Sequence, residues 1–177
     1  RLHELLDESW IPLGYKSADH EMQMKKQGYD LLRRYYDTFH SQHVSIVDLE
    51  KPFKIRISRD IAINGKIDRI DHKKNGIEII DYKTGKKPLD RELKKSLQLS
   101  IYALAALDQP GMADLLEQVT LTFYYLQDME KISMNRNQKE IEEVKDTIID
   151  TAAAINSGQF PPKVGIHCNF CPFRMIC

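Results

Sequence analysis

The sequence predicts an α/β fold with a mixed central β-sheet flanked by helices, and three observations carry this prediction. Apolar residues recur at helical spacing in residues 17–40 and 137–156. Alternating, β-rich segments lie between them. The dipeptide Asn75-Gly76, which favours a tight hairpin turn, joins two of those segments. The order of helices, strands, helix, strand and helix is typical of a layered α/β domain.

The first part of the chain is predicted to be helical. Residues 1–9 resemble the last turns of a helix, and residues 17–40 carry a rough apolar stripe among charged residues. Because the chain starts at Arg1, with the beginning of that first helix missing, we expect it to be a fragment of a larger protein.

Three strands are expected next, in residues 44–58, 61–70 and 76–84. The short connections between them favour an antiparallel meander. Pro52 is expected to interrupt the first strand or to mark it as an edge strand, because proline cannot donate a backbone hydrogen bond to a neighbour.

The second half is predicted to supply a helix over about 90–108, a buried strand over 119–126 and an amphipathic helix over 137–156. Gly158 and two prolines then introduce a cysteine-bearing tail, residues 158–177. We expect residues 1–177 to form one domain, since this length suits a single core but not two.

Composition excludes several classes of protein. With 42% hydrophobic and 29% charged residues the chain is typical of a soluble globular protein. No apolar run approaches the roughly 18 residues that span a bilayer, so no membrane association is expected. The 26 basic and 26 acidic residues cancel, so any nucleic-acid binding must depend on a local basic patch.

The three cysteines, Cys168, Cys171 and Cys177, fall within the last ten residues. An odd number packed this closely is a poor disulfide framework. The spacing suits a metal or a cluster and a reducing compartment, so we expect a cytoplasmic protein.

The chemistry is expected at the end of the third strand. Alternation places Asp81 and Lys83 on one face after an apolar row, and Asp68, in the preceding strand with Lys66 and Ile70, can point to the same side. Two close carboxylates repel each other and need a cation, and oxygen ligands favour Mg²⁺ or Mn²⁺. The competing interpretation is an exposed edge hairpin with a weak surface ion pair.

These segments resemble a known family. Gly65-Lys66-Ile67-Asp68-Arg69, then Ile79 to Gly85 (IIDYKTG), then Gln98 and Tyr102 are similar to the RecB-like branch of the PD-(D/E)xK nuclease superfamily. Ile67 stands where the name of the superfamily has proline. The resemblance implies a restriction-endonuclease-like core, and Glu50 and Phe53 match its acidic-then-aromatic step before the first core strand.

The resemblance also implies a set of site residues. His3, Asp68 and Asp81 would hold Mg²⁺ or Mn²⁺, with the Tyr82 carbonyl as a further ligand. Asp68 and Asp81 are thereby expected to be catalytic.

Three more residues are implied to take part in catalysis. Lys83 would orient or activate the attacking water, and Gln98 and Tyr102 would line the DNA groove and position a phosphate or the water. The last two lie on one helical face, four residues apart.

The tail resembles the last three ligands of the iron–sulfur staple found in some of these nucleases, including AddB-type ones. This implies a [4Fe–4S] cluster held by Cys168, Cys171 and Cys177 and by a fourth cysteine before Arg1. In the present chain that cluster is expected to be incomplete or absent.

The expected function is a Mg²⁺- or Mn²⁺-dependent deoxyribonuclease, exonuclease or single-strand endonuclease, acting in DNA end processing, recombination or repair. The resemblance is greatest to the nuclease modules of superfamily 1 (UvrD-like) helicases, so helicase domains in the same chain or in a partner subunit are expected. Six basic and two acidic residues in 82–97 would meet the DNA backbone without reading its sequence. A CRISPR-associated adaptation nuclease and a non-catalytic DNA-binding scaffold are the alternatives.

Overall fold

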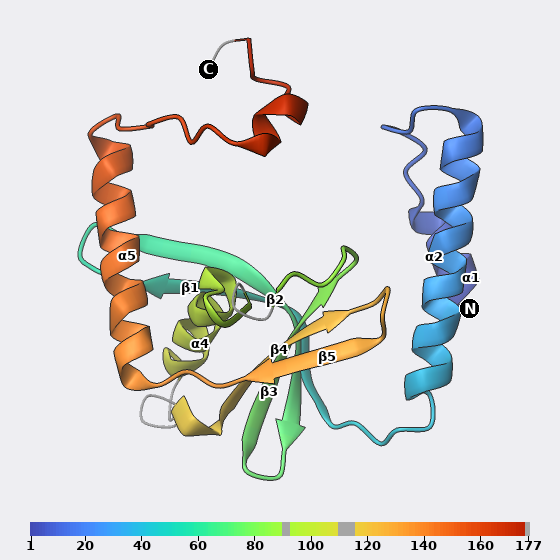
Figure 1. Cartoon of the computed structure of the whole chain (residues 1–177). Helices are drawn as coiled ribbons and strands as arrows, with labels where there is room; N and C mark the ends of the chain where they lie inside the picture. Colours follow the sequence, from blue (N-terminus) through green and yellow to red (C-terminus); the bar gives the residue numbers. More distant parts are fainter. Residues whose placement is uncertain (90–92, 110–115, 176–177) are drawn as a thin grey trace.

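The computed structural model describes residues 1–89, 93–109 and 116–175 and centres on a five-stranded sheet in the order β1-β2-β3-β4-β5 (Figure 1). The strands are β1 (Ile46–Arg56), β2 (Ala62–Lys73), β3 (Gly76–Lys83), β4 (Val119–Tyr125) and β5 (Glu130–Met134). Neighbouring strands are antiparallel except β3 and β4, which are parallel. The predicted mixed sheet is therefore confirmed, and β5 is a strand that the sequence did not predict.

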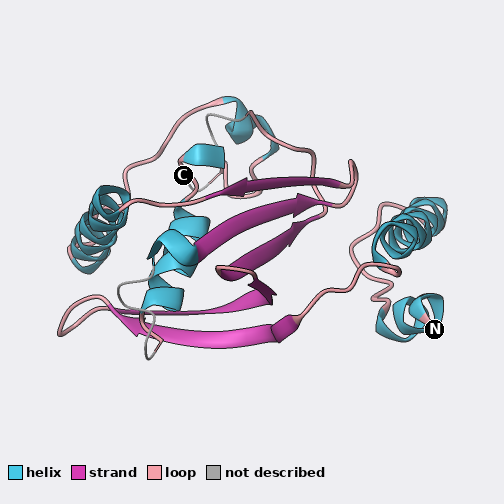
Figure 2. Cartoon of the chain, turned by 90° about the horizontal axis from the view of Figure 1, so that it is seen from below, coloured by secondary structure: helices cyan, strands magenta, loops and turns pink. Residues whose placement is uncertain are grey.

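Helices flank this sheet as expected. They are α1 (Leu2–Ser9), α2 (Ala18–Phe39), α4 (Leu97–Leu107) and α5 (Gln138–Asn156), with short 3₁₀ helices η1 (Leu116–Gln118) and η2 (Ile166–Phe170). The α1–α2 pair lies at one side of the sheet, whereas α5 lies at the other with α4 between α5 and the strands (Figures 1 and 2). None of the helices in the described residues is long and apolar enough to cross a membrane.

The helix predicted over 90–108 is only partly confirmed. Residues 90–92 lie outside the described part of the chain, and α4 begins at Leu97 after Ser96, whose side chain accepts a hydrogen bond from the Leu99 backbone N–H. Serine is a favoured N-cap because its hydroxyl satisfies an N–H that has no partner inside the helix. This cap places Gln98 in the first turn of α4.

The core lies between the sheet and α4 and α5. Alternation in β3 points Ile79 inward and Glu78 and Tyr82 to the other face, as predicted, and Ile79 packs with Leu121 of β4 and Leu99 of α4. The turn into β3 requires glycine, because Gly76 has a φ of 133° and a Cβ there would lie 2.0 Å from the Gln118 carbonyl oxygen.

The predicted alternation in β2 is wrong at one point. Ile67 is buried in the core, whereas Lys66, predicted to share the face of Asp68 and Ile70, is exposed and pairs with Glu50. Glu50, in the edge strand β1, has a φ of 51°, in the left-handed region, and the β1–β2 register shifts nearby, between Ile46 and Asp48. Pro52 also lies in this edge strand, in agreement with the prediction.

Candidate active site at the ends of strands β2 and β3

Asp81 is the most deeply buried carboxylate of the site. It follows the apolar row of β3, and only 3% of its surface is exposed. Its Oδ1 atom accepts hydrogen bonds from Gln98 Nε2 at 2.9 Å and from the Tyr102 hydroxyl at 3.0 Å. Burial, followed by the charge of Asp81, raises the pKa of Tyr102, so this hydroxyl keeps its proton and can donate it to the carboxylate.

The second oxygen of Asp81 is unsatisfied. Among the described residues, Oδ2 is a buried side-chain atom without a hydrogen bond of acceptable geometry. Lys83 Nζ lies 2.6 Å from it, which is an ion pair by distance but is not aligned as a hydrogen bond. The ammonium group compensates the buried charge, but Oδ2 keeps a lone pair that accepts no hydrogen bond, and a carboxylate oxygen of this kind fits a metal ion.

Lys83 connects the buried carboxylate to the outside of the domain. Its Nζ donates a 2.7 Å hydrogen bond to Gln98 Oε1 and lies 5.0 Å from the centroid of the Phe123 ring. One third of the side chain, 33%, is exposed. The ammonium group therefore lies at the boundary between the buried carboxylate and solvent.

Asp68 faces this group from β2. Its Oδ2 accepts a 2.9 Å hydrogen bond from the backbone N–H of Tyr82, directly after Asp81. The last backbone pair of the β2–β3 ladder is Arg69 with Ile80, and one further step along the same register places Asp68 opposite Asp81. Burial and then the charge of Asp81 raise the pKa of Asp68, and these effects outweigh the opposing Tyr82 hydrogen bond.

Gly65 in β2 allows the ring of Phe53, next to Tyr102, to approach the strand closely. A Cβ at Gly65 would lie 2.7 Å from the ring of Phe53, so only glycine leaves room for that ring. The Phe53 ring in turn packs edge-on against Tyr102, with the centroids 6.0 Å apart. The aromatic residue of β1 thus supports the tyrosine that donates to Asp81.

Arg136 is a site-supporting residue that the sequence did not reveal. It is buried, its Nε donates a 2.8 Å hydrogen bond to Ser100 Oγ, and its Nη2 donates to the Ser96 carbonyl at 3.3 Å. These bonds tie the beginning of α4, and with it Gln98, to the loop after β5. The contact joins positions 36 or more residues apart, so no local pattern could have predicted it.

The structure does not bring His3 to this group. Its ring packs against Tyr29 at 4.8 Å, within the α1–α2 pair. Helix α2 meets the sheet through Tyr35, which contacts Tyr82 and thus the face opposite Asp81. In the described residues, no cluster of three or more His, Cys, Asp or Glu side chains could hold a metal, so the predicted ligand set of His3, Asp68 and Asp81 is not formed.

Two carboxylates are nevertheless compatible with binding of Mg²⁺. Mg²⁺ keeps several waters and is commonly bound through one or two carboxylates together with phosphate oxygens of the substrate. Asp68, Asp81 and the unsatisfied Oδ2 atom of Asp81 match that requirement. The role of the Tyr82 carbonyl stays a prediction.

The cysteine tail follows α5 and lies away from the strands (Figure 1). Cys168 and Cys171 are half-buried and not disulfide-bonded, and the Cys168 Sγ accepts a 3.4 Å hydrogen bond from the Gly165 backbone N–H. Cys177 lies outside the described residues. Within the described part of this tail, Phe170 and Phe173 are 87% and 63% exposed, so neither residue is packed into an apolar core.

The raised pKa of Asp68 has a consequence for stability. A carboxyl that holds its proton more tightly in the folded than in the unfolded state loses stability as pH rises from its ordinary pKa, about 3.9, through its folded value. We therefore expect metal-free Asp68→Asn to melt at a higher temperature than wild type at neutral pH, and the difference to vanish below the ordinary aspartate pKa.

Thermal melts across pH, with the exposed Asp60→Asn as matched control, check this prediction. Saturating Mn²⁺ should reverse the order, because only the wild-type carboxylate binds the ion. An Asp68→Asn variant that is less stable than wild type at neutral pH without metal would contradict the electrostatic account.

Comparison with known families agrees with this geometry. The model of the PD-(D/E)XK nuclease superfamily matches residues 1–177. The chain belongs to the PD-(D/E)XK nuclease superfamily. Members of this superfamily generally use divalent metal ions.

Among curated proteins, the chain is 34% identical over 92 residues to one subunit of the ATP-dependent helicase/deoxyribonuclease of Streptococcus pyogenes serotype M1. The match covers 50% of this chain but only 8% of that relative.

Among solved structures, the chain is similar to the crystal structure of SSO0001, with a TM-score of 0.52, 19% identity, and coverage of 88% of this chain and 70% of that one. This likeness supports the restriction-endonuclease-like α/β fold. A candidate exonuclease from Eubacterium rectale aligns with a TM-score of 0.47 and 13% identity, covering 96% of this chain and 64% of that one.

Proposed function

We propose that this domain is a Mg²⁺- or Mn²⁺-dependent deoxyribonuclease that hydrolyses phosphodiester bonds. The observation that carries the proposal is the buried Asp81 carboxylate, whose Oδ2 atom has no aligned hydrogen bond while Lys83 lies 2.6 Å away. Membership of a nuclease superfamily supports the same reaction.

Asp68, Asp81 and the Tyr82 carbonyl would hold the ion. When bound, it would stabilise charge on the phosphate and favour ionisation of the attacking water. The hydrogen bonds that Gln98 and Tyr102 donate to Asp81 Oδ1 would keep the carboxylate oriented, with Oδ2 directed to the ion.

Lys83 changes partners in this proposal. Without DNA it neutralises Asp81, and an ion bound there would release the ammonium for the substrate. The hydrogen bond to Gln98 would then hold Lys83 where it can orient the water or stabilise charge on the phosphate.

DNA would lie over the exposed side of Lys83. The segment after β3 adds Lys86 and Lys87, and exposed Lys94 and Lys95 precede α4. Such side chains contact phosphates and position the strand without reading the bases. The proposed substrate is therefore DNA of any sequence, as a single strand or as a duplex end.

The work of the domain is proposed to be coupled to DNA unwinding. The relative from Streptococcus pyogenes is named as a helicase/deoxyribonuclease subunit, which supports helicase domains in the same chain or in a partner subunit. DNA end processing in recombination or repair is the corresponding role.

A [4Fe–4S] cluster is proposed for the parent protein, with Cys168, Cys171 and Cys177 as three of its ligands and a cysteine before Arg1 as the fourth. Closing this loop would tie the exposed tail to the α1–α2 end of the domain. Anaerobic iron and sulfide analysis of the longer protein should find about four of each per chain. Finding no iron with all four cysteines present would contradict the cluster.

A cleavage assay tests the nuclease itself. Linear and circular single-stranded DNA and blunt duplex DNA are incubated with the purified protein and Mn²⁺ or Mg²⁺. Products should appear with either ion and disappear with EDTA, and cutting of the circle would identify endonuclease activity. DNA binding without cleavage of any substrate would instead indicate a non-catalytic scaffold.

A further inference from the structure

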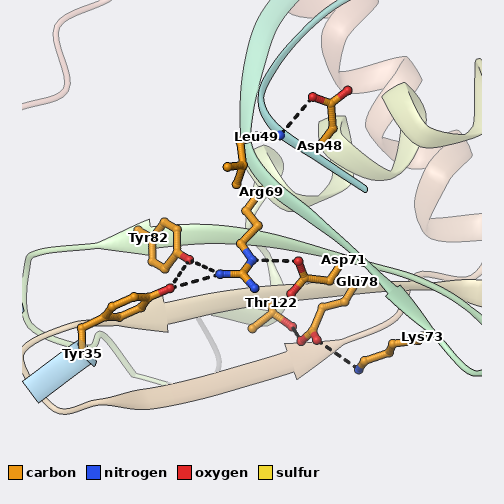
Figure 3. A network of polar contacts seen from close by, with 9 residues as sticks. All are labelled: Tyr35, Asp48, Leu49, Arg69, Asp71, Lys73, Glu78, Tyr82 and Thr122. Carbon is orange, nitrogen blue, oxygen red and sulfur yellow. Dashed lines mark hydrogen bonds and ion pairs between the residues drawn. The ribbon is translucent and has the colours of Figure 1, made fainter. Parts of the chain in front are cut away.

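A second polar cluster lies on the face of the sheet opposite Asp81, around Arg69 (Figure 3). Arg69 Nε donates a 2.7 Å hydrogen bond to Asp71, and Nη1 donates to the hydroxyls of Tyr35 at 3.1 Å and Tyr82 at 3.3 Å. The two hydroxyls are 2.8 Å apart. Only 13% of the Arg69 side chain is exposed, so these contacts are made largely out of water.

The backbone alone does not hold β2 against β3 at the candidate active site. Within the described residues their ladder ends at the pair Arg69 and Ile80, whereas the ladder between β3 and β4 continues to Lys83 and Tyr125. Asp81 is thus fixed by β4, whereas Asp68 lies one residue beyond the last backbone pair between β2 and β3, and its neighbours Ile67 and Arg69 pair with β1. At this level the contacts between β2 and β3 therefore come from side chains.

Tyr82 forms hydrogen bonds with β2 on both faces of the sheet. Its backbone N–H donates to the Asp68 carboxylate on the active-site face, and its hydroxyl meets the Arg69 guanidinium on the other. Asp68 and Arg69 are consecutive residues of β2, so the two hydrogen bonds hold β2 at the same position.

We propose that Arg69 is a positioning residue of the nuclease site, which clamps β2 to β3 through the Tyr82 hydroxyl and so holds Asp68 beside Asp81. This inference rests on the proposed function, since it concerns the same pair of carboxylates. The clamp acts against their mutual repulsion, which would otherwise separate them when no ion is bound. Partners one layer behind metal ligands commonly change metal affinity by about 10- to 100-fold when they are removed.

The main variant is Tyr82→Phe, which removes the hydroxyl and leaves the backbone N–H in place. Arg69→Met alone would leave Asp71 as a buried, unpaired carboxylate, so the second variant is Arg69→Met with Asp71→Asn. Tyr36→Phe, on the exposed side of α2, is the matched control.

The readout is Mn²⁺ affinity without DNA, measured by the loss of the free-ion electron paramagnetic resonance signal. Tyr82→Phe and the Arg69→Met/Asp71→Asn pair should each weaken binding by about tenfold or more, and Tyr36→Phe should not. Combining all three substitutions should add little, because contacting partners are not additive. At saturating Mn²⁺ the KM for DNA should stay unchanged.

The outcomes separate this inference from the proposed function. If wild type binds Mn²⁺ and cuts DNA, and both the Tyr82→Phe and the Arg69→Met/Asp71→Asn variants bind Mn²⁺ as tightly as wild type, the clamp is overturned and the proposed function stands. An equal loss in Tyr35→Phe also overturns it, because the effect would then come from docking of α2. Wild type that neither binds Mn²⁺ nor cuts DNA overturns the proposed function and the clamp with it.

Discussion

Asp81→Asn should lower the rate of DNA cleavage by on the order of 10³-fold or more, the largest effect that we expect from a single substitution. Asp81 supplies the most buried negative charge of the site, and its unsatisfied Oδ2 atom is the position that an ion would complete. Asparagine keeps the shape and can still accept from Tyr102, but it removes that charge.

The measurement pairs a cleavage time course with Mn²⁺ titration of the same preparation. Asp81→Asn should lose both cleavage and Mn²⁺ binding, whereas Asp60→Asn, an exposed aspartate in the β1–β2 loop, should keep both. Undiminished Mn²⁺ affinity in Asp81→Asn would show that the ion binds elsewhere.

Lys83→Ala should separate the two properties that Asp81→Asn loses together. Cleavage should fall by about 10²- to 10³-fold, because the group that orients water or stabilises phosphate charge is gone. Mn²⁺ binding should be retained or strengthened, since the ammonium 2.6 Å from Asp81 no longer competes with the ion. DNA binding should stay nearly intact, because the neighbouring lysines keep their phosphate contacts.

Lys74→Ala is the matched control, since it removes an exposed lysine in the β2–β3 turn, at the end of β3 opposite to Asp81. Single-turnover cleavage, Mn²⁺ affinity and DNA affinity are compared for wild type and both variants. Comparable cleavage by wild type and Lys83→Ala, in pure preparations with Mn²⁺, would count decisively against a catalytic Lys83.

The central strands and the placement of Asp81 and Lys83 could be predicted because they depend on local pattern. Alternation in β3 sends Asp81 and Ile79 to one face, and Asn75-Gly76 determines the β2–β3 turn. The short strand β5 escaped prediction because its residues are mostly exposed and form part of the sheet only through pairing with β4.

The misplaced residues depend on contacts that no local pattern contains. His3 sits on a helix whose position is set by the packing of α2 against Tyr82 and Tyr124. Ile67 and Ile70 both pack with the core, which strict alternation along β2 does not allow. Arg69 belongs to the motif Gly65 to Arg69, but its contact with Tyr35 could not be predicted, because Tyr35 lies 34 residues away in the sequence.

The most direct test of the central claim is the position of a bound ion. Crystals of the domain soaked in Mn²⁺ and measured at the manganese absorption edge locate the metal without reference to activity. We predict an anomalous peak between the carboxylates of Asp68 and Asp81, with Lys83 moved away from the Asp81 Oδ2 atom. No peak between these carboxylates at saturating Mn²⁺, or an ion held only by residues elsewhere, would contradict the account.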